Sequence, residues 1–89
     1  MLEKVKIALR LRSPAFDAEI ENLIAACKAD LRLAGITVPK KPADPLIERA
    51  VILYCKGNFG YIEGGERFIE AYNYLKCALS LAGDYNAVE

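Results

Sequence analysis

The segment DPLIERAVILYCKGNF, at residues 44–59, constrains the fold most, because it reads as a helix with almost no polar side. At about 100° per residue, one apolar face contains Ile47, Ala50, Val51 and Tyr54. A second apolar flank contains Ile52, Cys55 and Phe59. A helix of this kind must be covered on most of its sides. We therefore expect it to lie at the centre of a helical domain.

Helical periodicity recurs in three other segments, and no alternating run of β-branched and aromatic residues predicts a strand. Ser13 and Asp44 each precede a proline, a pattern typical of a capped helix start. Gly35 fits the left-handed residue that ends a helix. The predicted helices span residues 2–11, 14–34, 45–59 and 66–82. The predicted fold is all-α, a small four-helix bundle-like domain over residues 1–83 with a central third helix and a flexible tail at 84–89.

The apolar content exceeds what a small helical domain needs for its own core. Of the 89 residues, 54% are hydrophobic, which is high for a soluble chain. A domain of this size buries only about 60–65% of its unfolded surface, so some of this apolar surface is expected to meet a partner or another copy. The predicted contact residues on the third and fourth helices are Ile52, Cys55, Phe59, Tyr74 and Leu81.

Charge is balanced over the chain but not along it. Twelve basic and twelve acidic residues cancel, which argues against a dedicated nucleic-acid binder. The first twelve residues nevertheless carry four basic side chains against one acidic one, either as a solvated face or as a contact with a polyanion or an acidic partner. Lys40 and Lys41 lie in a proline-rich loop that is either an exposed turn or a contact loop.

The chain lacks the residue patterns typical of most catalytic and metal sites. The chain has no histidine, and its three cysteines, Cys27, Cys55 and Cys77, are far apart with no C-x-x-C spacing. We therefore expect free thiols, no metal, no cofactor and no enzymatic activity. The N-terminus lacks the apolar region of a signal peptide, and no apolar run is long enough to cross a membrane. A soluble, cytosolic protein is expected.

Three segments together resemble one family. They are VKIALRLRSPAFDAEIENLIAACKADLRLAGI at 5–36, DPLIERAVILYCKGNFGY at 44–61 and ERFIEAYNYLKCALSLA at 66–82, and ILYCKGNFGY is the most specific part. In order and pattern they resemble the small all-helical head–tail connector proteins of tailed bacteriophages and prophages, often described as DNA-packaging or head-completion proteins.

The resemblance implies a role in virion assembly without catalysis. Such proteins form a ring, typically of twelve copies in the virion, that lies beneath the portal, continues the DNA channel after packaging and presents a docking surface to the tail. The implied partners are copies of the chain itself, the portal protein and tail-side or head-completion proteins. DNA passes through without sequence-specific binding, and no membrane is involved. The implied location is the cytoplasm of the bacterial host during assembly and then the head–tail interface of the virion.

Two other classes of function compete with this interpretation. A small helical DNA-binding regulator could use the basic first helix on phosphates. Against it, the second helix starts with acidic residues, and the 36–45 loop exceeds the three to four residues usual in a helix-turn-helix. The other alternative is a generic protein-interaction module, such as a toxin-neutralising or adaptor bundle.

Overall fold

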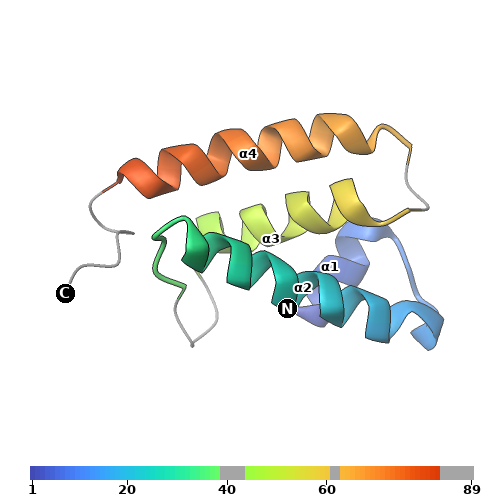
Figure 1. The fold of residues 1–89 in the computed structure, drawn as a ribbon. Coiled ribbons are helices and arrows are strands. Elements are labelled where there is room, and N and C mark those ends of the chain that lie inside the picture. The colour runs from blue at the N-terminus through green and yellow to red at the C-terminus, as the bar shows by residue number, and fades with distance from the viewer. Residues whose placement is uncertain (39–43, 61–62, 83–89) are drawn as a thin grey trace.

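A computed structural model describes residues 1–38, 44–60 and 63–82. Within these ranges the regular elements are α1 (Leu2–Leu9), a short 3₁₀ turn η1 (Pro14–Phe16), α2 (Asp17–Leu33), α3 (Pro45–Asn58) and α4 (Gly65–Leu81), as Figure 1 shows. The predicted all-α class is confirmed. No described helix combines the length and the apolar character required to cross a bilayer. Lys40, Lys41 and the predicted 84–89 tail fall outside the described ranges.

The predicted start signals act as capping groups. The side chain of Ser13 accepts a hydrogen bond from the backbone N–H of Ala15 at 3.1 Å, although it starts the 3₁₀ turn and not α2 itself. The carboxylate of Asp44 accepts from the N–H groups of Leu46 and Ile47 at 2.9 and 3.3 Å. These bonds satisfy donors that a helix start leaves without intrahelical partners.

The first helix is shorter than the predicted 2–11 span. It ends at Leu9 because Arg10 adopts a left-handed conformation with φ of 61°. The N–H of Leu11 then bonds back to the carbonyl of Lys6 at 2.9 Å, which closes the helix end. A non-glycine residue rarely takes positive φ, so periodicity alone gave no warning of this early stop.

The third helix is central, as predicted, because it contacts α1, α2 and α4. In Figure 1, α4 lies along the top of the molecule, α3 lies beneath it, and α1 and α2 lie on the other side of α3. Most core side chains come from the inward faces of these four helices. The core comprises Val5, Leu9, Ile20, Ile24, Cys27, Leu31, Ile36, Ile47, Ala50, Val51, Leu53, Cys55, Phe59, Tyr72 and Leu79.

Two glycines let α3 and α4 approach closely where one ends and the other begins. A Cβ added at Gly65 would lie 2.9 Å from the carbonyl oxygen of Gly57, a distance that real Cβ atoms essentially never show. A Cβ added at Gly57 would lie 2.5 Å from Cδ1 of Ile69. The sequence associates both glycines with a break between helices, whereas the structure places each inside a helix at a tight crossing.

Candidate subunit interface

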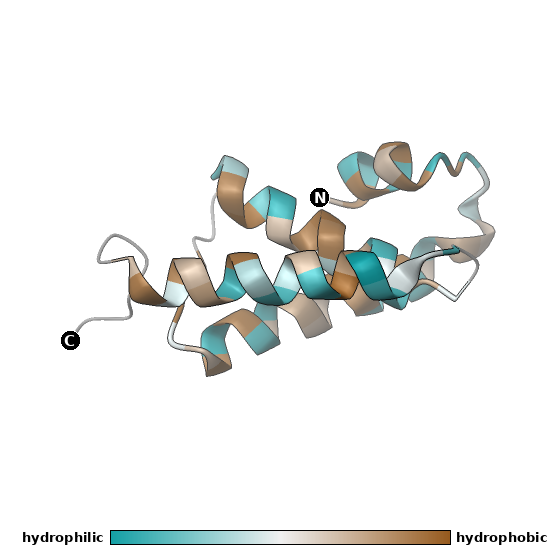
Figure 2. Ribbon diagram, turned by 90° about the horizontal axis from the view of Figure 1, so that it is seen from above, coloured by the Kyte–Doolittle hydropathy of each residue, from teal (hydrophilic) through white to brown (hydrophobic). Residues whose placement is uncertain are grey.

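From Ala71 to Leu81, the outward side of α4 carries an apolar stripe with no charged residue, whereas the first turns of the same side carry charged side chains. Its exposed members, called the α4 face below, are Ala71, Tyr74, Cys77, Ala78 and Leu81. They recur at three- and four-residue intervals and therefore share one side of the helix. Tyr74 and Leu81 are 80% and 79% exposed. In Figure 2 the end of α4 near the C-terminus is brown, while its first turns carry dark teal bands.

A polar cluster holds α4 in this orientation. The hydroxyl of Tyr72 donates to Oδ2 of Asp30 on α2 at 2.6 Å, and the ammonium group of Lys76 contacts the same oxygen at 3.0 Å. The Tyr72 hydrogen bond, and then Lys76, lower the pKa of Asp30 below its ordinary value. The carboxylate is therefore charged at neutral pH and fixes α4 against α2.

Aromatic packing supports the same orientation from α3. Tyr72 is only 2% exposed, and its ring meets that of Tyr54 edge-on with centroids 5.1 Å apart. Burial is the largest cause of the raised pKa of Tyr72, and its bond to Asp30 is the next. Because Tyr74 follows Tyr72 by two residues, or about 200° around the helix, anchoring one ring inward turns the other to solvent.

The flank predicted on the third helix is not a free surface. Cys55 is fully buried and Phe59 is only 3% exposed, so the expectation that these two side chains remain spare for a neighbour is corrected. Ile52 is half-buried and packs against the same core. Of the predicted contact residues in the described ranges, Tyr74 and Leu81 alone are exposed.

Backbone geometry explains the burial of Phe59. This residue caps the C-terminus of α3 in an extended conformation, with φ of −81° and ψ of 113°, so a helical projection does not give its direction. Its ring instead meets the ring of Phe16 edge-on at 5.4 Å. The short turn after α1 thus packs on the C-terminal end of α3. Sequence analysis did not predict this contact.

A second exposed face, on α2, was not singled out from the sequence. Its members, called the α2 face below, are Ala18, Asn22, Ala25, Ala26, Ala29 and Leu33, of which all but Asn22 are apolar. Leu33 is 87% exposed, the highest value among the exposed large hydrophobic residues. The available signal was the presence of alanine at positions 18, 25, 26 and 29, on one side of the helix, which periodicity analysis based on large apolar residues overlooks.

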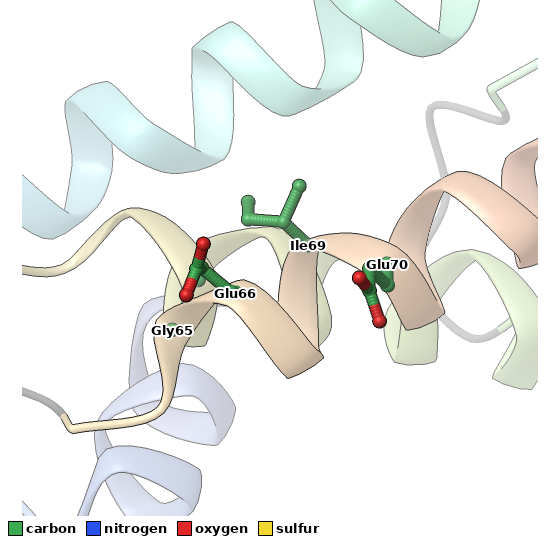
Figure 3. Close-up of a pocket in the computed structure, with 5 residues that line it drawn as sticks. Gly65, Glu66, Ile69 and Glu70 are labelled. Carbon is green, nitrogen blue, oxygen red and sulfur yellow. The ribbon is translucent and has the colours of Figure 1, made fainter.

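Two shallow hollows of opposite charge also lie on the surface. One, of about 470 Å³, is lined by Gly57, Gly65, Glu66, Ile69 and Glu70. Figure 3 shows its two glutamates on the same side of α4. The other, of about 550 Å³, is lined by Ile7, Arg10, Leu11 and Arg12. Charged side chains line both hollows, so neither matches the charge-free apolar surface of the α4 face.

A family model described as phage connector protein matches residues 1–86. The chain belongs to the phage connector protein family. The resemblance carried by the three sequence segments is thereby confirmed, and the family gives this connector a structural role in phage assembly. No curated protein and no solved structure matches the connector.

The thiols of the connector differ in their environments. Cys27 and Cys55 are buried, and burial is the main cause that raises their pKa values to about 11 and about 12. Both are therefore uncharged at neutral pH and poor nucleophiles. Cys77 is exposed in the middle of the α4 face. Within the described ranges, no three Cys, Asp or Glu residues gather as a metal site.

Proposed function

We propose that this connector is a subunit of a ring at the portal vertex, where it joins head to tail and continues the DNA channel after packaging. Membership of the phage connector family supports the assembly role. The single structural observation that carries the proposal is the charge-free apolar face of α4, on a protomer whose central helix is already covered. Large apolar side chains exposed side by side mark a surface that another protein covers.

The core is closed within one protomer, so the protomer does not need a neighbouring copy to complete its fold. Val51 and Cys55 on α3 are fully buried within one protomer. A protomer of this kind folds first and meets its neighbours later, as an ordered assembly pathway requires. In a closed ring each copy uses two different surfaces, one for each neighbour.

The proposed partners are further copies of the chain, the portal protein and tail-side or head-completion proteins. Assembly takes place in the host cytoplasm, and the finished ring lies at the head–tail interface of the virion. Equal numbers of basic and acidic residues suit a channel that DNA crosses without being retained, because retention by a basic wall grows with the number of phosphates neutralised.

The test combines the purified full chain with the portal ring of the same phage and images the product by electron microscopy. We expect a second ring stacked on the portal. Tyr74→Asp places a charge on the α4 face and should abolish that ring, while Ile7→Asp, at a residue 75% exposed on α1, is the matched control and should retain it.

Two results would contradict the proposal. One is a connector that never joins the portal, and the other is Tyr74→Asp protein that still forms the ring. Binding to duplex DNA that weakens steeply with salt would instead favour the small helical regulator.

A further inference from the structure

We propose that the α4 face of one copy docks antiparallel onto the α2 face of the next copy. This inference rests on the proposed ring and adds which two surfaces meet and in which direction. It arises from two exposed helix faces that complement each other in shape and in charge.

The two faces differ in the size of their exposed side chains. Tyr74 and Leu81 project from α4 as large apolar side chains, each about four-fifths exposed. The middle of the α2 face consists of Ala25, Ala26 and Ala29, whose small side chains leave a flat surface. Flat small-residue surfaces let a second helix approach closely, with its large side chains lying over the alanines. The same contact covers Leu33, the most exposed of the large hydrophobic side chains.

Charge selects the direction. The exposed side of α4 begins with Glu66, Arg67 and Glu70, two acids and one base, so this end is net negative. In contrast, α2 begins with the exposed acids Glu19 and Glu21 and ends with the exposed base Arg32. Antiparallel docking brings the α4 acids to Arg32 and the uncharged end of α4 to the alanines. Parallel docking would bring acid against acid. Complementary charge at the edge of an apolar contact fixes orientation in this way.

The alternative of two α4 faces pairing with each other fits less well. Such a pair is isologous and closes as a dimer, so it supplies no route to a ring. It also leaves Leu33 and the whole α2 face in water. Docking of α4 on α2 uses two different surfaces of each copy and repeats around a ring.

The contact is small, which makes its strength dependent on ring closure. The α4 face from Ala71 to Leu81 is roughly 15 Å long at 1.5 Å per residue. Two such faces bury less than the roughly 800 Å² per partner of a standard stable interface. An isolated pair is therefore weak, while a closed ring gives every copy two contacts at high effective concentration.

The experiment uses Cys77 as a native crosslinking group on the α4 face. Ala26→Cys and Ala29→Cys each add a second thiol on the α2 face, and Ile7→Cys adds one at a similarly exposed site on α1 as the matched control. Each full-length variant is oxidised with diamide, alone and with the portal, and examined on non-reducing gels. Because Cys27 and Cys55 are buried and their pKa values are raised, we expect both thiols to remain unreacted.

We expect Ala26→Cys or Ala29→Cys to give a ladder of dimers, trimers and higher species, at least tenfold above the Ile7→Cys control. When the unsubstituted protein forms no Cys77–Cys77 dimer, such a ladder shows that Cys77 of one copy meets the new thiol of the next. An equal ladder from Ile7→Cys, or no ladder from either α2 variant with or without the portal, overturns the inference. Unsubstituted protein that yields mainly Cys77–Cys77 dimers overturns it in favour of the isologous pair.

A charge exchange tests the direction. Glu70→Arg or Arg32→Glu alone should lower the ladder yield about three- to tenfold, and the double variant should recover it, since the exchanged charges meet between copies. Failure to recover overturns the antiparallel arrangement. Portal-bound rings without α2 crosslinks would reject this interface and leave the proposed function intact, while ladders without portal binding would reject the proposed function and leave the interface.

Discussion

Helices α3 and α4 have comparable apolar patterns, but the second apolar flank of α3 is covered and that of α4 is exposed. Both carry apolar residues on more than one side, and both contain a buried face and a second apolar flank. In α3 the second flank is covered by the same protomer, so Cys55 and Phe59 are buried. In α4 the second flank, with Tyr74 and Leu81, faces solvent. The number of helices packed around a segment, and not its apolar content, decides which apolar surface remains for a partner.

Position in the fold explains the difference. Three helices contact α3, whereas α4 lies in an outer layer that packs mainly on α3 (Figure 1). The bonds from Tyr72 and Lys76 to Asp30 then fix the rotation of α4. One flank is therefore held outward on a stable support, as a docking surface requires.

The sharpest test of this contrast is Phe59→Asp, which should unfold the protomer. It removes a buried ring that packs on Phe16 and leaves an unpaired buried charge. Loss of the ring alone costs about 3–5 kcal/mol, which approaches the whole stability of a small domain. Circular dichroism should show loss of most helical signal at 25 °C. A folded Phe59→Asp protein would mean that this end of α3 is not enclosed.

A smaller loss of stability is expected from Gly65→Ala, which tests the close crossing of α3 and α4. The new methyl group meets the carbonyl oxygen of Gly57 at 2.9 Å, so the two backbones must separate, at a cost of about 1–3 kcal/mol. Urea unfolding monitored by circular dichroism measures the change. Gly60→Ala is the matched control, because nothing lies within 4 Å of its added Cβ. Equal stability of the two variants would disprove the tight crossing.

Asp30→Asn should lower the free energy of unfolding by about 1 kcal/mol at pH 7, because it weakens charge-assisted bonds that are partly screened by solvent. The pKa of Asp30 is lowered in the folded state, so its stabilisation is present above the unfolded pKa and is lost as pH falls through the folded value. Urea unfolding of both proteins at pH 7 and at pH 2 measures this effect. The difference in midpoint between the variant and the parent should be smaller at pH 2 than at pH 7. A difference in urea midpoint that does not change with pH would contradict this account. Glu21→Gln, at an exposed residue of the same helix, is the control.

The smallest effect on stability is expected from Tyr74→Asp on the α4 face. Its side chain is 80% exposed, so the free energy of unfolding should change by less than about 0.5 kcal/mol. Thermal or urea unfolding at low protein concentration gives the measurement. The same variant should nevertheless fail to assemble, which separates this flank from that of α3. A loss of several kcal/mol would show instead that Tyr74 belongs to the protomer core.

Much of the fold follows from local sequence signals. The four helices, the caps at Ser13 and Asp44 and the left-handed Gly35 depend on hydrogen bonds and backbone preferences within a few residues. The family likeness also depends on linear pattern, and it is confirmed over residues 1–86. These features could be predicted because each is decided locally.

The exposed surface was decided only by tertiary structure. The sequence could show that α3 and α4 each had a spare flank, but not that Phe16 would cover Phe59 or that Asp30 would anchor Tyr72 and Lys76. These contacts join residues more than forty positions apart, and periodicity along one helix contains no information about its neighbours. Local hydrogen bonding therefore fixes where the helices of this protein lie in the chain, while long-range packing fixes which of their apolar sides remain free.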